Sequence, residues 1–494
     1  MPDRRDQQRL YQHVIQVYNV EKRDALNIQP QTIGTLFTLA VCGQAEAHTS
    51  EQSFVLLLPT EIYISAGVLA VLFTIVILAA LPSDLTRKLF NSIKILPVPR
   101  SRHTAVVTSL LSLCLLLSLI TVGFVGSHDP LKNLLPLTIW TVWWVGFIFI
   151  QGILGNLWRW LNPWSGLFYL ASRLQLIKAP MFKLPEPLGV WPAIAIYLLF
   201  SAFALADISP EDPQRLALIV SVYWLFTFSA MILFGEKWLK QGECFTVLLE
   251  RIARLAPVAI QQRDIRIGLP GWQQLATPPN SLSAALLILT LLAVGSFDGL
   301  NETFWWLAML GINPLEFPGR SAVIVQTLSG LLGAVLLLVS VFAACIWLGT
   351  ILANRIGPHR VGFTQALLAQ SGAVLPIALA YHFAHFLTAF MVNIQYTAAA
   401  ATDPLQNGLD LLGLGRFYVT TGFFNTQDTV RAIWLTQAGA VVLGHIFSVL
   451  MAHVIAERLW KSSRQAVLSQ LPLSIFMVLY TLLGLWLLAA PRGA

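Results

Sequence analysis

Residues 322–350 read AVIVQTLSGLLGAVLLLVSVFAACIWLGT, an apolar run without a charged side chain. At about 1.5 Å of rise per residue, roughly 20 such residues cross the ~30 Å hydrocarbon core of a bilayer as an α-helix. Comparable windows recur along the chain and predict ten spans. They lie near residues 62–82, 104–124, 137–155, 190–207, 216–234, 281–298, 322–350, 363–391, 432–455 and 467–489. The expected fold class is all-α, a polytopic integral membrane bundle of these helices.

The composition excludes a water-soluble globular enzyme. Of the 494 residues, 56% are hydrophobic and only 11% are charged, and the mean hydropathy is +0.69. Soluble domains carry about 25% charged residues, so the lipid bilayer is the expected solvent. The net charge of +7 comes from short loops between apolar runs, a pattern that reports orientation in a membrane and not a nucleic-acid partner.

The basic residues gather in every second loop. If the mature chain starts outside, the outside loops are mostly acidic or neutral, as in Asp207–Asp212. This distribution follows the positive-inside rule and predicts a multi-pass protein of the bacterial inner membrane with its mature N-terminus outside. The inside loops then hold Arg87, Lys88, Lys94, Arg100, Arg102, Arg159, Arg173, Lys178, Lys183, Lys237, Lys240, Arg251, Arg254, Arg263, Arg266, Arg355, Arg360, Arg458, Lys461 and Arg464.

The N-terminal residues 1–47 differ from the rest of the chain. A polar, basic tail precedes the apolar stretch 33–43, and Ala45-Glu46-Ala47 provides a small-x-small cleavage site, so we predict a cytoplasmic tail and a cleavable signal peptide. Residues 48–494 then form a single transmembrane domain. Cleavage would leave His48 first, where its amine and imidazole could chelate copper together; the alternative is that the cleavage site merely happens to precede a histidine.

Several familiar chemistries lack their sequence signatures. Cys42, Cys114, Cys244 and Cys345 are scattered without a CxxC spacing, which indicates neither a disulfide framework nor a zinc-thiolate site. The chain has no GxxxxGK[ST] loop, no GxSxG elbow and no HExxH helix. ATP-driven and serine-hydrolase mechanisms lose support accordingly.

Ionisable residues inside predicted spans are the best candidates for function, because burying them in a bilayer is costly. His382 and His385 lie three residues apart on one helical face, and His445 and His453 lie in the next span. Asp298 ends the sixth span on the same outer side. Imidazoles with a carboxylate suit zinc, iron or copper. The same residues could instead hold a bis-histidine haem, relay protons or bond carbonyls across helix interfaces.

Two long loops complete the prediction. The inside loop 236–280 contains an amphipathic stretch, Phe245–Leu255, which we expect to lie on the membrane surface. The outside loop 393–431 is rich in glycine and is expected to form turns or a re-entrant lid.

Several short segments of the chain form a recognisable set: Phe234-Gly235-Glu236-Lys237-Trp238 leading to Phe245, Ser296-Phe297-Asp298-Gly299, Ala384-His385, Asp403-Pro404, Gly444-His445 and Ala452-His453. Together they resemble the bacterial fenitrothion hydrolase-like family of multi-spanning membrane proteins. The resemblance implies a membrane-bound organophosphorus ester hydrolase. The family pattern has only the second histidine of the Tyr381-His382-Phe383-Ala384-His385 segment, so it favours His385 over His382. We therefore expect a metal site with His385 and His445 as ligands and Asp298 as ligand or general base.

The leading hypothesis is therefore a membrane enzyme that uses a divalent metal in an outward-facing cavity to hydrolyse an ester. A metal or ion transporter is the first alternative, with the histidines passing a cation or proton. A haem-binding or purely structural subunit of a membrane complex is the second. In each case the partners are the lipid bilayer and a small molecule or ion, and no nucleic acid is expected.

Overall fold

The computed structural model describes Val55 and residues 58–97, 102–177, 179–261, 264–316, 319–415 and 417–492. The predicted signal segment, its cleavage site and His48 lie outside these residues. The described part is mostly helical, and ten of its helical stretches are long and apolar enough to cross a membrane. The all-α, ten-span prediction is confirmed, because each span carries its own signal in length and hydropathy.

Seven of the ten spans are single helices, and three contain shorter pieces. The single helices are α3 (Thr60–Ala80), α5 (Arg102–Val125), α11 (Pro213–Phe234), α15 (Leu282–Asn301), α17 (Ile324–Ile356), α20 (Gln427–Trp460) and α21 (Ser463–Ala489). The third span joins α6 (Leu134–Pro136), a π-helix (Leu137–Phe147) and α7 (Ile148–Leu154); the fourth joins a 3-10 turn (Glu186–Leu188) to α10 (Trp191–Ala206); the eighth joins α18 (Phe363–Ser371), a 3-10 turn (Gly372–Val374) and α19 (Leu375–Thr402).

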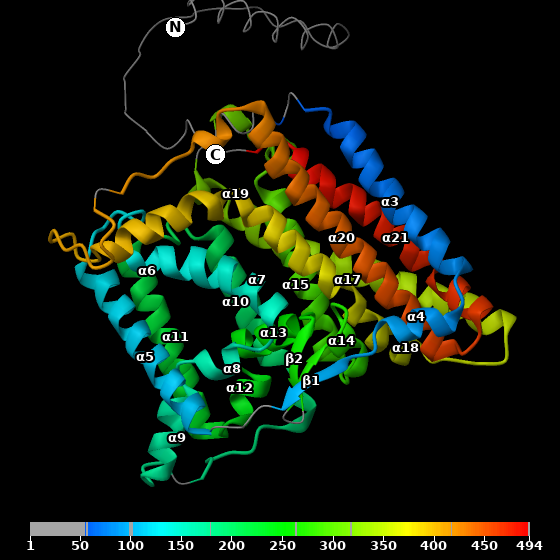
Figure 1. Cartoon of the computed structure of the whole chain (residues 1–494), viewed down its shortest axis with the longest axis horizontal. Helices are drawn as coiled ribbons and strands as arrows, with labels where there is room; N and C mark the ends of the chain where they lie inside the picture. The colour runs from blue at the N-terminus through cyan, green and yellow to red at the C-terminus, as the bar shows by residue number, and fades with distance from the viewer. Residues whose placement is uncertain are drawn as a thin grey trace, which may run out of the picture. The chain divides into compact units, whose positions relative to one another are not determined.

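Helices α15 and α20 form the centre of the packing. In α15 and α20, 67% and 61% of the apolar window is buried, whereas only 17% is buried in α3 and in α5, whose side chains face outward. Helix α3 packs against α20 and α21, so the first and last spans lie side by side (Figure 1). Side chains on α15 and α20 therefore point into protein more often than into lipid.

A glycine permits a close helix crossing near the candidate residues. A Cβ on Gly444 of α20 would lie 2.5 Å from Ala380 Cβ and 2.9 Å from the carbonyl oxygen of Pro376, both on α19. Residue 444 thus faces α19. Because successive helical residues are rotated by about 100°, His445 is turned away from α19.

The long loop before α15 is folded and not laid on a membrane surface as we expected. Its helix α13 (Cys244–Ala253) is buried on most sides, and Gln151 of α7 donates a hydrogen bond to the carbonyl of Leu249. Glu243 caps the helix by accepting from the backbone of Phe245 and Thr246, and burial raises the pKa of its carboxyl. The prediction failed because the apolar face of an amphipathic helix packs equally well against protein.

The other short elements on the predicted inner side connect spans, and a small sheet joins this loop to an earlier one. The short helices are α4 (Ser83–Leu89), α8 (Trp158–Leu161), α9 (Ser165–Arg173), α12 (Lys237–Gln241) and α14 (Trp272–Ala276). A three-stranded antiparallel sheet has the order β1 (Ile93–Pro97), β3 (Asp264–Ile267), β2 (Val258–Gln261). Lys94 and Asp264 form an ion pair of 2.9 Å across it.

The predicted outer loop begins later than expected, because α19 continues to Thr402 through an alanine-rich segment with high helix propensity. After it, Asp403 accepts hydrogen bonds from the backbone of Asn407 and Gly408, and Asp410 accepts from Leu414 and Gly415. These two turns confirm part of the expectation. On the same side lie α16 (Phe304–Met309) and 3-10 turns at Pro314–Glu316, Arg320–Ala322 and Gly422–Phe424.

Candidate metal centre

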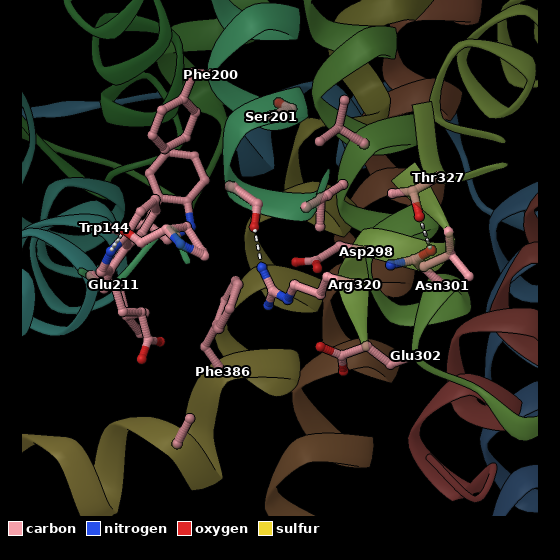
Figure 2. A pocket seen from close by; sticks show the side chains of 18 of the residues that line it. Trp144, Phe200, Ser201, Glu211, Asp298, Asn301, Glu302, Arg320, Thr327 and Phe386 are labelled. Atoms are coloured by element: carbon pink, nitrogen blue, oxygen red, sulfur yellow. Dashed lines mark hydrogen bonds between the residues drawn. The ribbon is translucent and has the colours of Figure 1, made fainter. Parts of the chain in front are cut away.

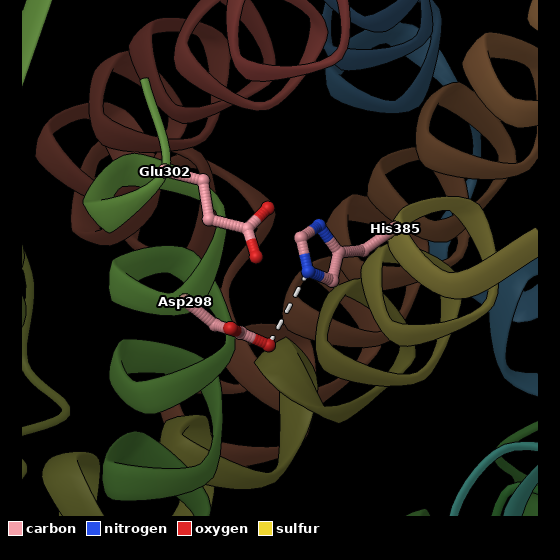
Figure 3. A group of neighbouring side chains, drawn as sticks. All are labelled: Asp298, Glu302 and His385. Atoms are coloured by element: carbon pink, nitrogen blue, oxygen red, sulfur yellow. Dashed lines mark ion pairs between the residues drawn. The ribbon is translucent and has the colours of Figure 1, made fainter. Parts of the chain in front are cut away.

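Three ligand-bearing side chains converge where α15 meets α19. Asp298 lies in the last turns of α15, and Glu302 follows four residues later at its C-terminal end, so both carboxylates lie on one helical face. His385 faces them from α19, with its Nε2 3.3 Å from Asp298 Oδ2 (Figure 3). One ligand atom from each of the three residues lies within 4.8 Å of the others.

This spacing fits a small divalent cation. Ligand atoms held at ~2.0–2.2 Å from a tetrahedral ion lie about 3.4 Å apart, close to the 3.3 Å between His385 and Asp298. The remaining separations, up to 4.8 Å, close with small rotamer changes of the exposed Glu302 carboxylate. One nitrogen and two carboxylate donors suit zinc, iron or manganese.

Tyr381 holds His385 from behind. Its ring stacks on the imidazole with a centroid distance of 5.8 Å and an interplanar angle of 14°. Its hydroxyl occupies the space beside Gly299, where a Cβ would lie 1.9 Å away. This hydroxyl is buried and has no hydrogen-bond partner among the described residues. Gly299, which lies between Asp298 and Glu302 in sequence, is therefore required for the close approach of α15 to Tyr381.

Arg492 borders the same group near the C-terminus. Its Nη1 lies 3.4 Å from His385 Nδ1 and 3.7 Å from Glu302 Oε2, and its Nη2 donates to the carbonyl of Leu487. With Arg492 donating to Nδ1, the imidazole proton is on Nε2 and points to Asp298. A cation bound at Nε2 would require the other tautomer and a small retreat of Arg492.

Two of the three residues, Asp298 and Glu302, line a cavity of about 310 Å³. Aromatic side chains such as Trp144 and Phe386 form much of its wall, and Asp298, Glu302 and Arg320 supply charge (Figure 2). Arg320 Nη1 donates a 3.0 Å hydrogen bond to the carbonyl of Ala204. Glu302 and Glu211 are exposed, so the cavity opens to the surroundings.

A smaller cavity of about 50 Å³ adjoins the first at Asp298. His382, His385 and Tyr197 line it together with apolar side chains, including Leu248 and Ile252 of the buried helix α13. The charged cavity thus adjoins, at Asp298, a narrow space with both polar and apolar walls.

The other predicted histidines that the structure describes are not part of the three-residue group, although His382 lines the smaller cavity beside it. His382 Nε2 contacts the carbonyl of Trp144 at 2.8 Å. His445 Nδ1 contacts the carbonyl of Val441 at 2.9 Å, and its ring lies 6.3 Å from that of Tyr480 on α21. His453 Nε2 lies 3.4 Å from Glu457 on its own helix. The structure therefore brings together Asp298 and His385, without His382, His445 or His453.

Glu302 and Arg320 did not emerge from the sequence. Glu302 had a detectable signal, because the spacing Asp298-x-x-x-Glu302 places two acids on one face of a helix. The predicted span ended at Asp298, so the next turn was counted as loop. Arg320 follows a separate loop, and nothing in its local sequence distinguishes it from a surface arginine.

Comparison with known proteins adds no family. Neither the protein-family models, nor the curated proteins, nor the solved structures include a match to this chain. The site must therefore be interpreted from its own geometry: one imidazole and two carboxylates beside a partly aromatic cavity in a multi-span membrane protein.

Proposed function

We propose that this chain is a membrane-bound, metal-dependent hydrolase of small esters. The observation that carries the proposal is that Asp298, Glu302 and His385 converge beside an open cavity of about 310 Å³. A cavity of this size suits a small organic substrate. The resemblance of the sequence to fenitrothion hydrolase-like proteins favours an ester, of the organophosphorus type, over other electrophiles.

Each side chain has a role in this proposal. Asp298, Glu302 and His385 hold a divalent cation, which when bound supplies Lewis acidity and lowers the pKa of nearby water. Asp298 borders both cavities and is placed to accept a proton from the attacking water. The water oxygen joins the acyl or phosphoryl centre, the ester bond breaks, and that proton returns to the departing alkoxide.

The cavity wall supports the same chemistry. The aromatic rings reduce the access of bulk water and pack against an apolar substituent, while Arg320 offers a guanidinium to a developing oxyanion. Because the guanidinium is already hydrogen-bonded to the Ala204 carbonyl, its position is fixed before substrate enters.

The test combines elemental analysis with hydrolysis assays on the full-length protein purified in detergent. Wild type should carry close to one transition metal ion per chain and cleave members of an aryl ester and phosphoester panel. Asp298→Asn and His385→Ala should lose both, whereas Asp428→Asn, which removes an exposed acid paired with Arg431, should lose neither. The proposal would be rejected if wild type bound no metal after incubation with zinc, iron or manganese, or if all variants hydrolysed the panel equally well.

A cation permease is the second candidate, favoured by the smaller cavity that continues past Asp298 to His382. It predicts that proteoliposomes accumulate zinc or manganese and that Asp298→Asn abolishes the uptake. Metal binding with uptake and without ester cleavage would select this function over hydrolysis.

A further inference from the structure

A third recess lies where α17 ends, and it shares no lining residue with the two cavities at Asp298. It is a groove of about 500 Å³ between the last turns of α17 and the loop that leads to α18. Trp347, Ile351 and Phe363 give it an apolar wall, and Arg355 and Arg360 give it two positive charges. By the positive-inside rule, this end of α17 is the cytoplasmic end.

The two arginines are available for a ligand. Both are exposed, and neither side chain forms an ion pair or hydrogen bond with any residue that the structure describes. Their neighbours are already paired among themselves. The Asn354 amide donates to the carbonyl of Val361 and accepts from its backbone N–H, and Gln465 donates to the carbonyl of His359.

These bonds hold the loop against α17 and α21, so the groove is present without a ligand. Gly357 allows the close contact, because a Cβ there would lie 2.2 Å from the Gln465 side chain. A preformed site loses less conformational entropy on binding than a mobile loop.

The apolar wall continues the surface that α17 turns outward. Leu336, Leu348 and Leu352 on this helix are 68%, 46% and 38% exposed, as expected of side chains that face acyl chains. Trp347 is 50% exposed near the polar end, the position that indole rings take at a membrane interface. Paired cations above a lipid-facing apolar groove match an anionic headgroup with its acyl chains attached.

We infer that this groove, formed by α17 and residues 357–363, is a binding site for an anionic phospholipid of the inner leaflet. Arg355 and Arg360 contact the phosphate, and the acyl chains follow α17. A free phosphate would use the arginines alone, whereas a lipid also uses the apolar wall. The site is independent of the proposed hydrolase function, since it shares no residue with the metal centre.

Native mass spectrometry of delipidated full-length protein tests the inference, with phosphatidylglycerol and phosphatidylcholine of identical acyl chains in equal amounts. Wild type should retain phosphatidylglycerol at least tenfold better. Arg355→Gln/Arg360→Gln should lose this preference, and Arg355→Lys/Arg360→Lys should keep part of it. Lys237→Gln/Lys240→Gln, which removes two exposed charges from α12 on the same predicted side, should behave as wild type.

Three results would overturn the inference. The first is equal retention of both lipids by wild type, and the second is unchanged preference in the Arg355→Gln/Arg360→Gln protein. The third is displacement of phosphatidylglycerol by millimolar inorganic phosphate, which would identify the groove as a site for a free anion. Thermal unfolding of each variant, monitored in the same detergent, shows whether a loss of lipid reflects a loss of fold.

Discussion

Two histidine–carboxylate pairs of almost equal length lie in this bundle. His385 and Asp298 are 3.3 Å apart, and His453 and Glu457 are 3.4 Å apart. We call His385 with Asp298 the open pair and His453 with Glu457 the closed pair, because their surroundings differ. The Asp298 side chain is 18% exposed and borders two cavities, whereas the Glu457 side chain is 2% exposed within the packed helices.

The difference lies in access and in the remaining hydrogen-bonding capacity. Around the closed pair, Thr86 donates to Glu457 at 2.7 Å, and the Gln470 amide lies 3.4 Å from His453 Nδ1. Around the open pair, a second carboxylate, Glu302, adds another ligand, and the contacts of Arg492 are long, at 3.4 Å to His385 and 3.7 Å to Glu302. The closed pair is therefore suited to stabilising helix contacts, and the open pair to binding a cation.

The largest expected effect is a loss of zinc affinity when the open pair is disrupted, compared with disruption of the closed pair. Asp298→Asn removes a charged ligand and should weaken zinc binding by at least about a hundredfold, more than the loss typical of residues that only support a ligand. Glu457→Gln should leave zinc affinity within about threefold of wild type, since the two sites share no residue. Competition titration with a chromophoric chelator measures both. Equal losses in the two variants would contradict a site restricted to the open pair.

The next largest effect is expected from a change behind the open pair, at the contact between Gly299 and Tyr381. Gly299→Ala places a methyl group where the Tyr381 hydroxyl lies, 1.9 Å from the new Cβ. Such overpacking costs about 1–3 kcal/mol, so the thermal midpoint should fall by several degrees and zinc affinity by roughly tenfold as His385 shifts. Gly439→Ala on α20, where nothing lies within 4 Å of the added Cβ, is the matched control. Identical thermal midpoints for the two variants would argue against a tight contact at Gly299.

Sequence reasoning succeeded where the signal is local to one helix. The spans near 62–82 and 467–489, for example, correspond to α3 and α21 because length and hydropathy are properties of each segment alone. It failed for Phe245–Leu255, because an apolar face does not specify whether protein or lipid covers it. The sheet joining β1 to the later loop was also missed, since its strands are short and far apart in sequence.

The site required information about rotation of helices that one sequence does not contain. Asp298 and His385 were expected on the same outer side of the membrane, and the structure brings them together. His445 was expected in the same site, but Gly444 faces α19, so His445 is rotated toward Tyr480 of α21. The side of the membrane follows from counting spans, whereas the neighbour that a side chain faces depends on which small residues permit close helix crossings.

A smaller effect on zinc affinity is expected from Arg492, which borders the open pair. Arg492 lies 3.7 Å from Glu302 and 3.4 Å from His385, so its charge opposes a cation at the same place. Arg492→Gln should raise zinc affinity by roughly three- to tenfold, because an ion pair this exposed contributes at most about 1 kcal/mol. Arg431→Gln, on an exposed ion pair with Asp428, should leave the affinity unchanged. Weaker zinc binding in Arg492→Gln would show that the arginine orients His385 and does not compete with the ion.

The smallest effect concerns the closed pair. Gln470→Leu removes an amide that contacts His453 at the long distance of 3.4 Å, and the leucine keeps most of the side-chain volume. A net hydrogen bond contributes about 1 kcal/mol and this one is long, so the loss of stability should stay below that value. The thermal midpoint in detergent should fall by only a degree or two, and zinc affinity should not change. A fall as large as that of Gly299→Ala would mean that Gln470 maintains the closed pair, because an imidazole without its partner is costly only where water cannot replace it.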